Sequence, residues 1–284
     1  MITLQLLNGL VYGSLLIIMA SGLVLIYGLR RVVNFAHGSL YMLGAYIGYS
    51  VSAYTNSQWL ALLVVCFLMA IIGYLLDKFC FKILQDRDPI ATVLVTYGLL
   101  LVFEDIVQTI WGKANYSLDA PEILRGSIEL SGMPFPIYRL SIIIVGVLVT
   151  ACLFLWLNKT RIGLFVRAAS TDPLTTATQG VNTDWVSGSV VAIGAALAGI
   201  AGVVAAPFLS LAPTMGSDIL VDSFVVVVIG GLGSFGGAFA AAMIVGQLQT
   251  FGAVYAQDVA SLLPFLLMLV VLIWKPSGIA GSRV

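Results

Sequence analysis

Charged side chains are scarce in this chain. Only 9% of its 284 residues are charged and 60% are hydrophobic, whereas a soluble domain carries about 25% charged residues. A fold of this size cannot hide so much apolar surface from water, so we expect lipid to be its solvent. The 13 basic and 13 acidic residues cancel at neutral pH. No basic excess is left to predict nucleic acid as a partner.

Catalytic and metal-ligating residues are also few. The chain has one histidine, His37, and three cysteines, Cys66, Cys80 and Cys152. The cysteines form no CxxC pair and are expected to pack as small apolar residues. One histidine excludes an HExxH zinc pair, and neither a G-x-S-x-G elbow nor a Walker A lysine occurs. The sequence therefore predicts no enzyme, no metal site and no bound cofactor, and any ATP hydrolysis belongs to another chain.

Long apolar segments dominate instead. Since a helix needs about 20 apolar residues to cross the hydrocarbon core, they predict an all-α polytopic membrane protein in which residues 1–284 form one transmembrane domain. The candidate spans are residues 4–29, 35–55, 59–76, 90–111, 140–157, 186–211, 235–256 and, shorter, 261–275. Residues 223–229 are apolar but too short to cross alone. We therefore expect eight or nine segments, with broken or re-entrant helices among them. The first segment starts almost at Met1 without a preceding positive stretch, and we interpret it as a span rather than a signal peptide.

The basic residues predict the orientation. If the N-terminus lies outside, ten of the 13 fall on one face and only Lys113, Arg125 and Arg139 on the other. The ten are Arg30, Arg31, Lys78, Lys82, Arg87, Lys159, Arg161, Arg167, Lys275 and Arg283. Basic loops stay in the cytoplasm. The excess therefore predicts an N-terminus outside, a C-terminus in the cytoplasm and an odd number of crossings.

Two loops are long enough to have a function of their own. Residues 112–139 are expected outside, and residues 158–185 in the cytoplasm. In the second loop Asp172 suits an N-cap, Pro173 the first helical position and Gly180 the helix end. This pattern predicts one short helix on the cytoplasmic surface. It serves either as a structural linker or as a docking helix for a partner.

The hexapeptide Asn-Phe-Ala-His-Gly-Ser at 34–39 separates two apolar runs. Such a polar break is either a loop at the membrane face or a broken helix that lines a pathway. In the second case Asn34 caps the next helix, His37 lies in its first turn, and the positive helix end attracts a solute carboxylate. In the first case Asn34 and His37 only tie the first two spans together at the cytoplasmic face.

A second break is rich in glycine and covers residues 229–237. Gly231, Gly233 and Gly236 fit G-x-G-x-x-G, the form of a dinucleotide fingerprint. No strand–helix alternation surrounds it and no acid follows about 20 residues later, so we reject that interpretation. The glycines either let helices pack closely or break a helix in the middle of the membrane, after a re-entrant half at 222–229.

Glu104 and Asp105 lie inside the fourth span, nearer its outer end. A carboxylate at the bilayer centre costs at least ~2.5–3.5 kcal/mol on insertion scales. Both side chains should therefore face protein or water. Either they make a hydrogen bond between helices or they line a polar pathway.

Together these motifs resemble a known family. Residues 34–39, followed by Leu-Tyr-Met-Leu-Gly-Ala-Tyr at 40–46, are similar to the signature of the branched-chain amino acid ABC permeases of the LivH type. Residues 229–237 resemble the second signature of that family, and Arg167-Ala168 leading to Gly180-Val181-Asn182 resembles its cytoplasmic coupling segment. The similarity covers nearly the whole chain.

The resemblance implies the permease of a type II-like ABC importer for branched-chain or other hydrophobic amino acids, in a bacterial-type plasma (inner) membrane. Its expected partners are a second permease subunit (a copy or a paralogue), two cytoplasmic ATPases that bind ATP and Mg, and a periplasmic solute-binding protein. Urea, short amides or aromatic acids are alternative solutes for the same architecture. A stand-alone channel or ion-coupled carrier is an alternative of another class.

The residue patterns and the resemblance together predict roles for individual residues. The expected pathway residues are Asn34, His37, Gly38, Ser39, Glu104, Asp105, Gly230, Gly231, Gly233 and Ser234. The expected ATPase-coupling residues are Arg167, Ala168, Asp172, Pro173, Ala177, Gly180, Val181 and Asn182. The chain departs from the family at Leu174, where an acid or polar residue is usual, and at Thr178-Gln179, where an apolar pair is usual.

Overall fold

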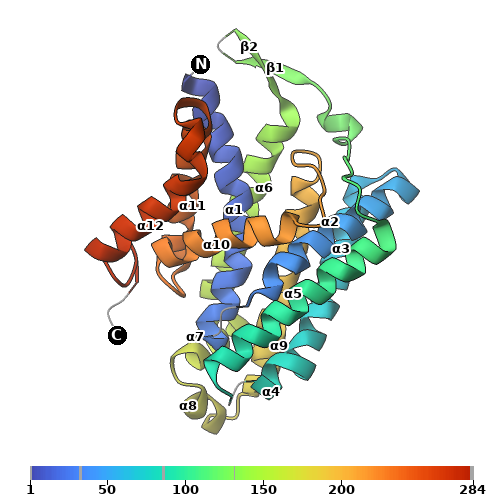
Figure 1. Ribbon diagram of the computed structural model, residues 1–284. Helices are drawn as coiled ribbons and strands as arrows, with labels where there is room; N and C mark the ends of the chain where they lie inside the picture. Colours follow the sequence, from blue (N-terminus) through green and yellow to red (C-terminus); the bar gives the residue numbers. More distant parts are fainter. Residues whose placement is uncertain (1, 32–33, 85–86, 131, 282–284) are drawn as a thin grey trace.

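The chain folds into a bundle of long helices in the computed structural model, which describes residues 2–31, 34–84, 87–130 and 132–281 (Figure 1). Seven of its helical stretches are long and apolar enough to cross a membrane. They are α1 (Ile2–Arg30), Gln58–Leu84, α5 (Pro89–Trp111), α6 (Ile137–Lys159), α9 (Thr183–Ala205), α11 (Phe235–Tyr255) and Gln257–Trp274. The second stretch comprises α3 (Gln58–Leu76), the π-helical turn η1 (Asp77–Phe81) and α4 (Lys82–Leu84), and the last comprises η3 (Gln257–Leu262) and α12 (Leu263–Trp274). The predicted class, an all-α polytopic membrane protein, is confirmed.

Two further helices are unlike these seven. The helix α2 (Ala36–Thr55) is continuous over 20 residues, but tyrosine, serine and glycine residues break up its apolar sequence. The helix α10 (Met215–Gly230) has 16 residues, which makes it about 24 Å long at 1.5 Å per residue. Figure 1 shows α10 running across α1 rather than alongside it.

The two ends of the bundle carry different structures. A hairpin of β1 (Ser127–Leu130) and β2 (Met133–Pro136), preceded by η2 (Glu122–Leu124), lies at the end where α1 begins. The short helices α7 (Arg161–Thr171) and α8 (Pro173–Thr178) lie at the opposite end (Figure 1). We call these the hairpin end and the α8 end. The loop at the α8 end holds two short helices, where the sequence predicted one.

The middle of the bundle is formed by α1 and α9, which are the most buried of the seven long stretches. Glycines let neighbouring helices approach them closely: a Cβ atom at Gly246 of α11 would lie 2.5 Å from the backbone nitrogen of Gly13 in α1. Such small-residue contacts stabilise helix pairs in lipid, where apolar side chains gain little by leaving the solvent. Few residues are buried in the stretches around α3, α5 and α6, as is typical of lipid-facing helices.

With α2 and α10 added to the seven long stretches, the described residues are consistent with the predicted eight or nine segments. Two predicted boundaries are wrong. The span expected at 186–211 stops being helical after Ala205, and the short helix expected from 222 begins at Met215. Ser217, Asp218 and Asp222 made its first turns look like a loop.

Candidate translocation site

The first turn of α2 lies against the middle of α1. The imidazole Nε2 of His37 is 3.1 Å from the carbonyl oxygen of Met19, and the ring is fully buried. Eleven residues separate Met19 from Arg30, or about 17 Å of helix. After Arg30 the chain therefore turns back into the bundle. The break at 34–39 lies inside the bundle, and the expectation of a tie at the cytoplasmic face is wrong in its depth.

Asn34 does not cap α2, contrary to the sequence prediction. Phe35 is the N-cap residue and makes no side-chain cap bond. Its helical backbone, φ −68° and ψ −27°, differs from the extended conformation that lets a cap side chain reach the free N–H groups. The backbone N–H of His37 donates to the carbonyl of Asn34 at 3.2 Å. Asn34 as a whole is 2% exposed, and neither the oxygen nor the nitrogen of its buried amide has a hydrogen-bond partner among the described residues.

The helix α10 also begins inside the bundle, next to the start of α2. A Cβ atom at Gly216 would lie 2.7 Å from the carbonyl oxygen of Gly38, so the two first turns touch backbone to backbone. In the first turn of α2, Ser39 Oγ donates to the carbonyl of Ala36 at 2.8 Å. Each helix N-terminus presents unpaired N–H groups and about half a positive charge. Two such ends meeting within a membrane protein are typical of transporter sites.

Carboxylates accompany these helix starts. Ser217 Oγ donates to Glu104 Oε1 at 2.5 Å, which joins α10 to α5 as a helix-to-helix hydrogen bond. Asp222 accepts from Tyr12 Oη at 2.5 Å and from Gln249 Nε2 at 2.9 Å. Asp218, one turn before Asp222, is exposed.

The chain thus places an exposed carboxylate on the surface of the bundle near the start of α10, and in a membrane protein such a group must face water or another protein chain. Asp105, next to Glu104 on α5, is exposed as well. Sequence reasoning missed Ser217, Asp218 and Asp222. The signal available was the spacing of Asp218 and Asp222, which places them one turn apart on a helix.

The glycine break at 230–234 lies elsewhere. It is the turn between α10 and α11, with φ +100° at Gly231 and +84° at Gly233, and Ser234 caps α11 by accepting from the N–H of Gly237 at 3.2 Å. A Cβ atom at Gly28, near the α8 end of α1, would lie 4.0 Å from Cα of Gly233. The glycines therefore serve close packing and a tight turn. The interpretation that they break a helix in mid-membrane is wrong, because the interruption is residues 206–214, before α10.

The predicted coupling segment has the predicted short helix. Asp172 caps α8 by accepting from the N–H of Thr175 at 3.0 Å and from its hydroxyl at 2.5 Å. These hydrogen bonds to the charged form hold the pKa of Asp172 below its usual value. Pro173 is the first helical residue, and Gly180 follows the helix with φ +85°.

The remaining predicted coupling residues lie at the two ends of the segment, where most of them make hydrogen bonds. Arg167 donates to the carbonyl of Leu157, and the carbonyl of Ala168 accepts from the N–H of Asp172 at 3.0 Å. The carbonyl of Ala177 accepts from the N–H of Gly180 at 3.0 Å. Asn182 Oδ1 caps α9 by accepting from the N–H of Trp185 at 3.0 Å, and Val181 is half-buried beside it.

A buried ion pair joins the end of α1 to the π-helical turn η1, next to the predicted coupling segment. Arg30, at the end of α1, is 2.7 Å from Asp77 in the π-helical turn, and both side chains are buried. Ser187 of α9 donates to the same carboxylate at 3.2 Å. Arg30 and Pro173 line one cavity of about 70 Å³, so α8 packs beside the residue from which the chain turns back into the bundle.

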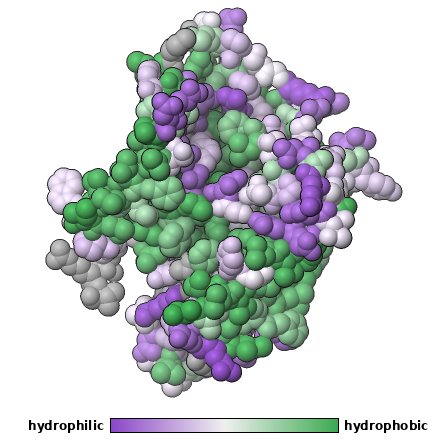
Figure 2. Space-filling model, viewed as in Figure 1, coloured by the Kyte–Doolittle hydropathy of each residue, from purple (hydrophilic) through white to green (hydrophobic). Residues whose placement is uncertain are grey.

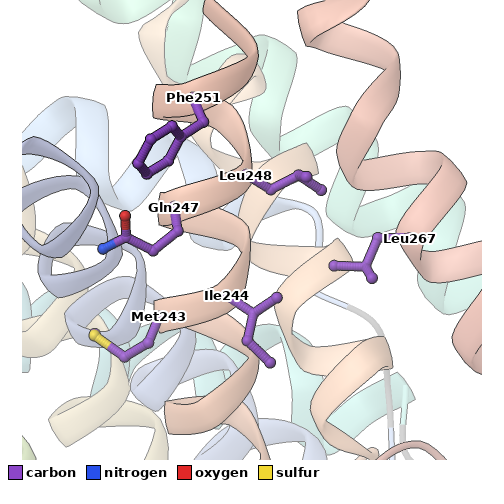
Figure 3. A pocket seen from close by; sticks show the side chains of 6 residues that line it. All are labelled: Met243, Ile244, Gln247, Leu248, Phe251 and Leu267. Carbon is purple, nitrogen blue, oxygen red and sulfur yellow. The ribbon is translucent and has the colours of Figure 1, made fainter. Parts of the chain in front are cut away.

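Three larger cavities occur among the described residues. One of about 490 Å³ is an open apolar groove between α11 and α12 (Figure 3). In Figure 3, Leu267 of α12 points toward α11, whereas Gln247 turns to the other side and donates to the carbonyl of Leu6 at 2.9 Å.

A second cavity, of about 740 Å³, lies at the α8 end beside Gly28, Ser170 and Gly233. The third, of about 290 Å³, lies between α1, α10 and α12 and includes Asn34. No group of His, Cys, Asp and Glu side chains able to hold a metal ion is found in the described parts of the chain.

The fold and this site define a polytopic membrane transport protein with two helices that start inside the bundle. Residues 5–272 match the family model described as "Branched-chain amino acid transport system / permease component". The chain belongs to this family.

Known relatives agree in length as well as in sequence. The chain is 28% identical to the high-affinity branched-chain amino acid transport system permease protein BraD of Pseudomonas aeruginosa, over 98% of this chain and 95% of BraD. It is 26% identical to the LivH permease protein of Escherichia coli strain K12, over 98% and 94%. It is 25% identical to a probable LivH of Methanocaldococcus jannaschii, over 96% and 91%.

One solved structure shares the fold. PsaBC from Streptococcus pneumoniae in complex with Fab matches with a TM-score of 0.50 and 12% identity, over 95% of this chain and 91% of that chain. At this identity the likeness concerns the fold alone.

Proposed function

We propose that this chain is the membrane-spanning permease subunit of an ATP-driven importer for branched-chain and other hydrophobic amino acids, which a periplasmic binding protein delivers. The observation that carries the proposal is the family match over residues 5–272. The names of BraD and LivH, which describe branched-chain amino acid transport, support the solute class. Urea, short amides and aromatic acids are the alternative solutes.

The hairpin end faces the periplasm and the α8 end the cytoplasm in this proposal, with the N-terminus outside. The distribution of basic residues supports it: Arg30, Lys82 and Arg167 are examples of the larger group at the α8 end, against Lys113, Arg125 and Arg139 at the other. Arg283, which the sequence analysis placed with the larger group, lies outside the described residues. The hairpin and the rest of residues 112–139 would receive the binding protein.

The ATPases, which bind ATP and Mg and hydrolyse the ATP, would dock at the α8 end. Leu174 supports this role. It is 80% exposed on α8, outside the membrane-spanning helices, where a large apolar side chain gains from burial against another protein. The second permease subunit, a copy or a paralogue, would cover the face crossed by α10, because the exposed Asp218 on that face cannot lie against lipid.

Co-purification and transport test the proposal together. The tagged chain is expressed with its second permease and ATPase subunits, reconstituted in liposomes and given leucine on its binding protein. We expect the ATPase to co-purify and leucine to accumulate only with ATP. Uptake that needs no ATP, or a chain that never captures an ATPase, would overturn the proposal in favour of a stand-alone channel or carrier.

A pair of variants tests the docking surface. Leu174→Ser should reduce ATPase capture, because it removes the exposed apolar side chain of α8. Ile123→Ser is the matched control, since Ile123 is equally exposed, at 80%, but lies at the hairpin end. Equal ATPase capture by both variants would exclude Leu174 as a docking residue.

A further inference from the structure

The cavity of about 740 Å³ at the α8 end is lined by segments that are far apart in the sequence. They are the end of α1, the end of α7, the turn between α10 and α11, and the end of α12 with the residues that follow it. Its wall is polar to a large extent, and no acidic residue is among the described residues that line it. An anion that enters the cavity therefore meets no carboxylate in the described lining.

The polar part of the lining offers hydrogen-bond donors that are not in use. The Arg31 side chain is exposed and makes no hydrogen bond or ion pair with the described residues. Tyr27 and Ser277 are half-buried, and their hydroxyl groups have no described partner either. The backbone N–H of Gly233 finds no acceptor in the described backbone. A guanidinium group with hydroxyl groups beside it is a donor set that suits phosphate oxygens, which arginine binds two at a time.

The charge around the cavity is positive. Lys275, directly after α12, is exposed, and its ammonium group donates to the carbonyl of Ile279 at 2.9 Å. Asp172, directly after the last residue of α7, is engaged as the cap of α8, where it accepts from the hydroxyl of Thr175 at 2.5 Å. The local charge therefore favours a ligand with a net negative charge over a zwitterion.

The cavity lies at the level where lipid headgroups are expected. Trp274, the last residue of α12, is 88% exposed, and exposed tryptophan at the end of a span is typical of the membrane–water interface. The lining residue Ser277 follows three positions later. Figure 2 shows hydrophobic surface over α12, at the left, and hydrophilic surface at the α8 end below it.

An apolar groove begins a short way along α12 from this cavity. It is the groove of about 490 Å³ between α11 and α12, into which Leu267 points (Figure 3). Leu272, which lines the cavity, is five residues further along α12, or about 7.5 Å. A positive site at the interface next to an apolar groove within the membrane has the chemistry of a phospholipid, with a phosphate at one end and an acyl chain at the other. A soluble anion uses only the first of the two.

We propose that the cavity binds the phosphate of an anionic glycerophospholipid, with Arg31 as its charged ligand, and that an acyl chain of the same lipid lies in the groove between α11 and α12. The hydroxyl groups of Tyr27 and Ser277 donate to the remaining phosphate oxygens. Basic pockets between membrane helices on the cytoplasmic side are known to bind anionic headgroups. The bound lipid bridges the ends of α1, α7 and α12. This site goes beyond the proposed function and does not depend on which solute is moved.

Binding of a short-chain lipid tests the proposal. The purified full-length chain in neutral detergent is titrated with dioctanoyl phosphatidylglycerol, and native mass spectrometry counts the lipids that stay bound. Dioctanoyl phosphatidylcholine is the zwitterionic comparison, and inorganic phosphate is the soluble anion. We expect phosphatidylglycerol to bind about fivefold more tightly than phosphatidylcholine, the effect of one arginine near a membrane surface. Equal binding of the two lipids would overturn the proposal.

Arg31→Gln should remove this preference. We expect its affinity for phosphatidylglycerol to fall about fivefold, to that for phosphatidylcholine. Arg161→Gln is the matched control, because Arg161 is exposed on α7 at the same end but is not among the described lining residues. Thermal midpoints without lipid check that each variant is folded. Arg31→Lys keeps the charge without the two-pronged geometry; it should bind with intermediate affinity and serves as the test if Arg31→Gln does not fold. Equal lipid binding by the Arg31 and Arg161 variants excludes Arg31 as the ligand.

Filling the groove distinguishes a lipid from a free anion. Ile244 lines the groove and is 44% exposed, so Ile244→Trp should weaken the binding of phosphatidylglycerol and leave that of inorganic phosphate unchanged. Leu269→Trp is the control, since Leu269 is 54% exposed on α12 and lines neither the groove nor the cavity. If phosphate competes as well as the lipid and Ile244→Trp binds lipid like the parent, the cavity is a site for anions only and the lipid assignment is wrong.

Discussion

Gly38 and Gly216 bring the first turns of two helices into backbone contact in the interior of the bundle. A Cβ atom at Gly216 would lie 2.7 Å from the carbonyl oxygen of Gly38. Both helices follow an irregular segment, one from each end of the bundle. Their positive N-terminal ends therefore converge at one depth, beside the carboxylates of Glu104 and Asp218. The contact brings together residues that are far apart in the sequence and fixes where a solute could be held.

Replacing Gly216 with alanine should separate the two helix starts. The added methyl group meets backbone, which cannot move aside as a flexible side chain can, so we expect a loss of about 1–3 kcal/mol from overpacking. The thermal midpoint of the purified complex in detergent measures this loss. Gly236→Ala is the control, because it lies in the first turn of α11 with nothing within 4 Å of its added Cβ. Equal midpoints for the two variants would contradict the close contact.

His37 should prove to be a stabilising residue as well as a neighbour of the pathway. Its Nε2 contacts the carbonyl of Met19, so His37→Ala removes that hydrogen bond and leaves a space, and we expect a loss of ~1–3 kcal/mol. His37→Gln keeps a donor on a side chain of similar reach and should retain most of the stability. Thermal midpoints and uptake are measured for both. A His37→Ala complex as stable as the parent but without uptake would instead assign His37 to solute binding.

Removing one partner of the buried Arg30–Asp77 pair should cost far more stability than removing one partner of the exposed Lys82–Asp184 pair at the same end. Removing one partner of a buried pair leaves an uncompensated charge and costs about 3–5 kcal/mol, so Asp77→Ala should unfold readily in detergent. Lys82 and Asp184 are 2.7 Å apart but about half exposed, and Lys82→Ala should cost only ~0–1 kcal/mol. Comparable losses for the two variants would contradict the burial of the first pair.

Asp172 should matter for α8 through its cap rather than through its charge. Asp172→Ala removes the acceptor of the Thr175 N–H and should loosen α8 and reduce ATPase capture. Asp172→Asn, which caps equally well, should retain capture. Because the folded pKa lies below the usual 3.8, the contribution of the carboxylate is full above that value and is lost as the pH falls through the folded pKa. Capture should therefore not vary between pH 6 and 8, and a fall in that window would contradict the assignment.

The sequence predicted the regular parts of this protein well. Apolar length identified the long spans, and Asp172, Pro173 and Gly180 predicted α8, because caps, proline and glycine act within a few residues of themselves. The glycine turn was found, but not its depth. The start of α10 was missed, because polar residues that bind Tyr12, Glu104 and Gln249 resemble a loop until those partners are seen.

The sequence by itself determined the solvent, the helical class and the family of this protein, since composition, periodicity and local motifs suffice for each. Only the tertiary structure decided the depth of the 34–39 break. Nothing in the hexapeptide says whether it lies beside Arg30 or beside Met19, because depth is fixed by contacts with distant helices. Those contacts place His37 and Asn34 in the middle of the bundle rather than at its edge, and the buried amide of Asn34 has no hydrogen-bond partner there among the described residues.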